Sequence, residues 1–87
     1  MQRDERGIAP FHASTPPPDG GQEIFQLGMS CITGASVDLI SAHKWFNVAA
    51  MLGHCDATRL RREIAAEMSE AEITAAQRAA RAWITRH

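Results

Sequence analysis

Two histidines and two cysteines in the middle of the sequence are candidates for metal binding or nucleophilic catalysis. They are Cys31, His43, His54 and Cys55. A structural zinc site usually shows paired ligands at Cys-x-x-Cys or His-x-x-x-His spacing, whereas here two candidates are adjacent and the others stand alone. Adjacent residues of a helix point about 100° apart, so one ion is hard to share between them. We therefore expect no metal site and no cofactor.

A catalytic cysteine would need a base within hydrogen-bond reach and a third group that orients this base. Cys55 with His54 or His43 is the combination to consider, and no sequence motif supports it. The short chain also leaves little room for a reactive pocket. We expect that the protein is not an enzyme, that Cys31 is a thiol of the core, and that Cys55 is a thiol in a loop.

Five arginines give the C-terminal half a basic character. They are Arg59, Arg61, Arg62, Arg78 and Arg81. A helix that reads DNA would need such arginines on one face. Four glutamates interleave with them, namely Glu63, Glu67, Glu70 and Glu72. A solvated helix surface is therefore favoured, and a small nucleic-acid-binding regulator that uses these arginines stays as an alternative.

Length and composition limit the possible functions further. The chain has 87 residues, which indicates one domain, and its formal net charge is −1, so no global field attracts nucleic acid or an anionic membrane. No window approaches the ~20 consecutive apolar residues of a membrane span. The first residues contain no apolar run of the kind that a secretory signal needs. A cytoplasmic protein without membrane contact is expected.

Proline and glycine divide the chain into two parts. All four prolines lie in the first 18 residues, and the run Pro16–Pro18 is followed by Asp19, Gly20 and Gly21. Such a segment has too few apolar residues to order itself, so we expect residues 1–21 to form a flexible tail. The rest, residues 22–87, is free of proline and is expected to be the folded domain.

Apolar residues recur at three- and four-residue spacing through this domain, which predicts an all-α protein of about four helices. The expected helices cover residues 22–33, 38–52, 56–68 and 70–86. Asp38 is a candidate N-terminal cap of the second helix, and Ser69 with Glu72 forms a capping-box pattern at the start of the fourth. Short connections between the helices predict antiparallel helical hairpins.

The side chains that pack these helices together can also be predicted. Small residues let the backbones of facing helices approach closely, and they are Gly28, Ala42, Ala49 and Ala50. We expect Trp45 to fill the space beside them and to lie in the core. Trp83 is expected to close the apolar stripe of the last helix.

A set of residues between positions 27 and 57 falls in one register. It consists of Leu27, Gly28, Gly34, Val37, Asp38, Ala42, Trp45, Ala49, Ala50 and Gly53. In this register the stretch resembles the SEL-1-like repeat, a short relative of the tetratricopeptide repeat. Residues 64–83 are similar to the capping end of bacterial members of this family. The family usually has two more residues between Val37 and Asp38, so the first loop should be shorter or differently turned.

The resemblance implies a fragment of an α-solenoid, with one repeat and a closing helical pair. Members of this family are generally adaptors that hold other proteins together. Repeat units stack because one unit cannot cover its own apolar face. Either the last two helices cover the second helix completely, or an apolar patch stays open, and such patches often mark a binding site.

We therefore predict a non-catalytic protein–protein interaction module or adaptor of the SEL-1-like repeat type. The candidate partner contacts are Met29, Trp45, Phe46 and Met51. The partner would be another protein, and self-association through the same patch is a variant of this prediction. An accessory subunit of an enzyme is a second alternative, which the sequence does not separate from an adaptor.

Overall fold

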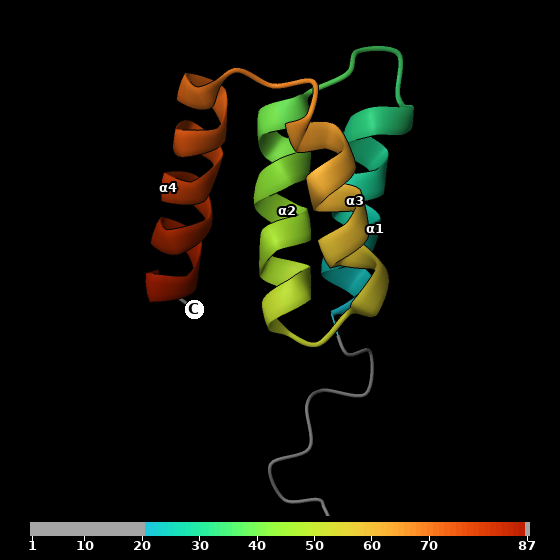
Figure 1. Cartoon of the computed structure of the whole chain (residues 1–87). Coiled ribbons are helices and arrows are strands. Elements are labelled where there is room, and N and C mark those ends of the chain that lie inside the picture. The colour runs from blue at the N-terminus through green and yellow to red at the C-terminus, as the bar shows by residue number, and fades with distance from the viewer. Residues whose placement is uncertain (1–20, 87) are drawn as a thin grey trace, which may run out of the picture.

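The computed structural model describes residues 21–86, and this part of the chain is all-α (Figure 1). It contains four helices and no strand between residues 21 and 86. The helices are α1 (Gln22–Thr33), α2 (Leu39–Met51), α3 (Cys55–Ala65) and α4 (Glu70–Arg86). The predicted fold class is confirmed. The predicted tail, residues 1–21, lies outside the described residues except for Gly21.

Helix α2 is the centre of the molecule. Helices α1, α3 and α4 all pack against it, and no other pair of these helices packs extensively. Figure 1 shows α1 and α3 on one side of α2 and α4 on the other side. The chain runs antiparallel from α1 to α2 and again from α2 to α3, so these two connections form the expected helical hairpins.

Helix α4 does not form a hairpin with α3, so the expected closing pair of helices is wrong. The connection after α3 carries the chain across the end of α2, and α4 then runs parallel to α2 on its far side (Figure 1). The fully buried Ala76 and Ala80 of α4 provide the reason. Their face is small and apolar, and it meets the face of α2 that α1 and α3 leave uncovered.

Local hydrogen bonds fix the starts of α2 and α4 as predicted. The Asp38 carboxylate accepts hydrogen bonds from the Ser41 backbone N–H at 3.0 Å and from the Ser41 hydroxyl at 2.8 Å. At α4 the capping box is complete. The Glu72 N–H donates to the Ser69 hydroxyl at 3.1 Å, and the Ser69 N–H donates to the Glu72 carboxylate at 2.8 Å. Each cap satisfies amides that have no partner within the helix.

Glycine and tight turns set the other helix ends. Gly53 has a left-handed φ of 100°, and the N–H groups of Gly53 and His54 return to the carbonyls of Ala50 and Ala49. This hydrogen-bond pair is the common glycine stop of a helix, as predicted. Helix α3 ends at Ala65 rather than at the predicted residue 68, because the chain winds into tighter turns before it crosses to α4.

The core is organised by Phe46, not by Trp45. Phe46 is fully buried, whereas Trp45 is only half-buried. The Phe46 ring lies against the backbone of Gly28, where an added Cβ atom would be 2.6 Å from Phe46 Cε1. Phe46 and Trp45 are adjacent, so they point about 100° apart, and the residue that faces α1 takes the core position. The prediction that Trp45 fills this space is therefore wrong.

We expect the substitution Phe46→Ala to destabilise the protein more than Trp45→Ala. Loss of the fully buried Phe46 ring leaves a cavity and should lower the free energy of unfolding by about 3–5 kcal/mol. Loss of the half-buried Trp45 ring should cost about 2 kcal/mol. Urea denaturation followed by circular dichroism measures both values. A Trp45 variant less stable than the Phe46 variant would contradict this assignment of the core.

The substitution Gly28→Ala tests the close approach of α1 and α2. Alanine improves helix propensity by about 1 kcal/mol, but overpacking against Phe46 should cost about 1–3 kcal/mol, so we expect a net loss of stability. Gly34→Ala is the matched control, because Gly34 is exposed and its nearest neighbour, the Ser30 carbonyl oxygen, is 3.4 Å from the added Cβ. Thermal melts in which Gly28→Ala equals or exceeds the wild type would refute the tight contact.

Candidate protein-binding groove

Two adjoining hollows lie between α2 and α4, and we call them together the α2–α4 groove. The smaller, of about 280 Å³, has an almost wholly apolar lining of Val48, Met51, Leu52, Trp83 and Ile84. The larger, of about 390 Å³, shares two of these residues and adds polar ones. It is lined by Asn47, Met51, Gln77, Ala80, Arg81, Ile84 and Thr85. The groove therefore has an apolar half and a polar half that meet at Met51 and Ile84.

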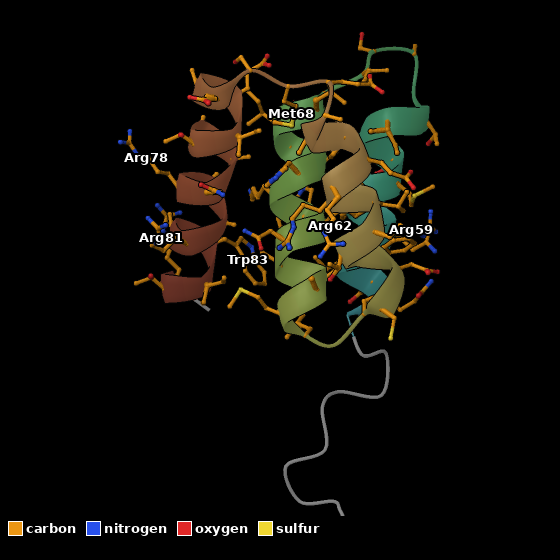
Figure 2. All side chains as sticks on the ribbon, viewed as in Figure 1. Arg59, Arg62, Met68, Arg78, Arg81 and Trp83 are labelled. Carbon is orange, nitrogen blue, oxygen red and sulfur yellow. The ribbon has the colours of Figure 1, made fainter. Side chains whose placement is uncertain are left out.

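The groove exists because α2 is the one described helix against which α4 packs extensively, and the contact is made through small side chains. Ala76 and Ala80 are buried at this contact and reach little beyond it. The larger Trp83 lies between the two helices, as Figure 2 shows, and its ring meets that of Trp45 edge-on with centroids 5.7 Å apart. The space beside these contacts is bounded by side chains but is not filled by them.

Met51 is the most exposed large apolar residue of the described chain. Its exposed fraction is 63%, although it lies in the last turn of α2 beside Trp83 and Ile84. A methionine side chain is flexible and polarisable, so it adapts to the shape of a partner. An exposed methionine in an apolar hollow is a suitable contact for an apolar side chain of another molecule.

The other three predicted contact residues lie elsewhere. Met29 is half-buried and packs against the core, whereas Phe46 is fully buried and is not presented to a partner. The placement of Phe46 among the contacts is therefore wrong. Trp45 is half-buried and packs against Trp83, which lines the groove. Trp45 itself does not line it. Of the four predicted contacts, the groove lining includes only Met51.

Sequence reasoning missed Ile84 and Arg81 as parts of the site. Ile84 belongs to the apolar stripe that Trp83 was expected to close, and Arg81 belongs to the helix surface that was expected to be solvated. One signal could have identified the groove. The apolar stripe of α4 carries alanines at positions 76 and 80 between the larger Ile73 and Trp83, so it cannot fill the space beside α2 along its whole length.

His54 joins two helices through its ring. The His54 ring stacks on Phe25 with centroids 4.0 Å apart, and its Nε2 lies 2.8 Å from the Gln22 side-chain oxygen. Because an amide oxygen only accepts, Nε2 carries the proton in this hydrogen bond. The interaction ties the start of α1 to the start of α3. Within residues 21–86 no three histidine, cysteine or acidic side chains come together as a metal site.

The two cysteines lie apart and both are free thiols. Burial raises the pKa of the Cys31 thiol, and the nearby Asp38 carboxylate raises it further. Cys31 packs at the edge of the core, which fits the prediction of a core thiol. Cys55 is exposed, but it is the first residue of α3 rather than a loop residue.

The arginines do not form one basic face. Arg59 makes ion pairs with Asp56 at 3.7 Å and with Glu63 at 3.1 Å. Figure 2 shows Arg59 on the outer side of α3, whereas Arg78 and Arg81 project from α4 on the other side of the molecule. A face that follows a nucleic-acid backbone would gather such charges on one surface. The arginines labelled in Figure 2 are instead spread over two sides of the molecule.

Between residues 21 and 86 the structure contains no helix with the length and apolar character needed to span a membrane. The chain matches no model of a known protein family, no curated protein and no solved structure.

We expect the stability of the protein to fall as the pH falls below 6.5, the ordinary pKa of histidine. Burial, and after it the positive charge of Arg61, lowers the pKa of His43, which is 3% exposed. Below pH 6.5 the unfolded chain takes up a proton at this position while the folded chain does not. The free energy of unfolding should therefore decrease by at most ~1.4 kcal/mol per pH unit.

The variant His43→Gln isolates this contribution from that of the other histidines. Urea denaturation at several pH values between 7.5 and 5 measures the slope for each protein. The variant should show a smaller decrease than the wild type over this range. Equal slopes for the two proteins would show that His43 does not contribute.

Proposed function

We propose that this chain is a non-catalytic protein-interaction module, an adaptor of the SEL-1-like repeat type, and that the α2–α4 groove is its docking surface. The observation that carries the proposal is Met51, which stays 63% exposed in an apolar hollow beside Trp83 and Ile84. Burial of one large apolar side chain in such a hollow is worth about 1.5–3 kcal/mol. The same groove offers hydrogen-bonding groups nearby, which can fix the orientation of a bound segment.

The size and shape of the groove suit a protein segment better than a small molecule. Pockets that bury a small molecule are typically ~300–1,000 Å³ and enclose most of the ligand surface. Here the two hollows, of about 280 and 390 Å³, lie at the lower end of this range, and both are open along the side of α4 rather than enclosed. Side chains of a bound peptide or helix could enter them while their backbone stays outside.

The sequence resemblance supports the same function, because the family consists largely of adaptors. The similarity of residues 64–83 to the capping end of bacterial members supports a bacterial source. The two free cysteines fit a reducing compartment, so we place the protein in the cytoplasm.

We expect the substitution Met51→Glu to remove partner binding without unfolding the protein. A carboxylate in the apolar hollow would be costly to desolvate in a complex, but it is solvated in the free protein. Val37→Glu is the matched control, because Val37 is 61% exposed and lies before α2, outside the groove.

Affinity capture from a lysate of the source organism tests the proposal with wild type, Met51→Glu and Val37→Glu as baits. A protein retained by the wild type and by Val37→Glu, but not by Met51→Glu, supports it. Retention of the same proteins by all three baits, or of none by the wild type, contradicts it. Circular dichroism of each bait checks that the fold is kept.

A further inference from the structure

We infer that residues 8–11 of this same chain occupy the apolar hollow of the α2–α4 groove and thereby compete with a partner for it. The ring of Phe11 is the side chain that enters the hollow beside Met51. This inference rests on the proposed function, because it concerns the regulation of the same groove. Its basis is the position of Gly21, the first described residue, and the sequence that precedes it.

Gly21 lies next to a residue of the groove. It is buried against the C-terminal end of α2, where an added Cβ atom would be 2.8 Å from the Ala49 carbonyl oxygen and 3.1 Å from Leu52 Cβ. Leu52 is also part of the lining of the apolar hollow. One side chain thus borders both the hollow and the point at which residues 1–20 join the described chain.

The directions of the helices bring the rest of the apolar hollow to the same end of the molecule. Helix α2 runs antiparallel to α1 and parallel to α4, so the start of α1 and the ends of α2 and α4 lie at one end (Figure 1). Met51, Trp83 and Ile84 belong to the last turns of α2 and α4. A segment that precedes Gly21 therefore starts at the apolar end of the groove.

The preceding chain is long enough to reach any part of the groove. Ten residue steps separate Gly21 from Phe11, and an extended chain of this length spans roughly 35 Å. Helix α2, with thirteen residues, is only about 20 Å long. The three prolines at positions 16–18 favour extended backbone, so this stretch would act as a spacer and not as a further turn of α1.

The sequence of this segment supplies a suitable side chain for the hollow. Apart from Met1, the large apolar residues among positions 1–20 are Ile8 and Phe11. A phenylalanine ring buries ~150–250 Å² and packs favourably on other aromatic rings in an edge-on or offset arrangement. Trp83 provides such a ring in the lining. Phe11 is therefore the residue of this segment that gains most from the hollow.

Attachment to the same chain favours this occupant over a separate molecule. A segment joined to its site through a short linker has an effective concentration in the mM range. A second copy, or another protein, binds from a lower concentration and needs a correspondingly higher affinity to displace it. Both occupants would use the hollow at Met51, so a partner binds only the fraction of molecules in which this hollow is free.

Nuclear magnetic resonance of the full chain with isotope-labelled methionine methyl groups tests the inference. Phe11→Ser should shift the Met51 methyl signal, because a neighbouring aromatic ring changes the magnetic field at this group. The signals of Met29 and Met68, which pack against the core, should stay in place and show that the fold is kept. His12→Ser is the matched control, since it removes a ring from the adjacent position and should shift none of the three signals.

A synthetic peptide of residues 1–20 is then titrated into the same proteins, with tryptophan fluorescence as the measure of affinity. Added to Phe11→Ser, the peptide should return the Met51 methyl signal toward its wild-type position. It should bind the wild type about tenfold more weakly than Phe11→Ser, as expected when the hollow is free in about one tenth of the wild-type molecules. Met51→Glu should not bind it.

The outcomes separate this inference from the proposed function. An unchanged Met51 signal in Phe11→Ser, or an equal shift in His12→Ser, would overturn the inference and leave the interaction module in place, because affinity capture with Met51→Glu tests that function separately. A Met51 signal that depends on protein concentration would identify a second copy as the occupant and would also overturn the inference. A Phe11-dependent signal, together with capture of no protein by Phe11→Ser, would support the contact and contradict the proposed function alone.

Discussion

The contact between the Phe46 ring and the Gly28 backbone is the constraint on which the rest of the structure depends. The ring occupies the volume that a side chain on α1 would need, so α1 can approach α2 only where it carries no Cβ atom. This approach buries Phe46 completely and places Phe25 beside it, with ring centroids 5.4 Å apart. The core of the α1–α2 hairpin is thus built around one aromatic ring and one missing side chain.

A second consequence concerns the remaining faces of α2. Because Phe46 directs one face of α2 toward α1, and α3 covers the next, the face that carries Trp45 and Val48 is left for α4. Trp45 then meets Trp83, and Val48 becomes almost fully buried. Helix α2, with thirteen residues, therefore packs against three other helices. The position of α4 follows from this demand together with the small apolar face that α4 presents at Ala76 and Ala80.

The features that depend on interactions between residues close in sequence were predicted correctly. The caps at Asp38 and Ser69 were correct because each depends on hydrogen bonds within a few residues. The choice between Trp45 and Phe46 failed because α2 is apolar on most of its circumference, so periodicity does not rank two adjacent aromatic residues. Which of the two rings lies in the core is determined by Gly28 on another helix, because the ring of Phe46 packs against its backbone.

The candidate site was predictable only in part for the same reason. Met51 could be named as a candidate contact because a methionine side chain suits an adaptable surface. Ile84 and Arg81 could not, because their role depends on where α4 docks, and the sequence predicted a hairpin with α3. A site formed between two helices requires their relative position, which comes from long-range packing.

The attachment of α4 to α2 through one face has a thermodynamic implication for binding. The helix is held through one face, by two alanines and a tryptophan pair, whereas a segment in the α2–α4 groove would contact α2 and α4 at once. Such a segment binds the docked arrangement and not an undocked one, so each bound molecule stabilises the docking of α4. The observed affinity is correspondingly reduced by any fraction of molecules in which α4 is undocked. Partner binding and the packing of Trp83 on Trp45 are therefore linked, and a change that loosens the tryptophan pair must weaken binding even though Trp45 does not line the groove.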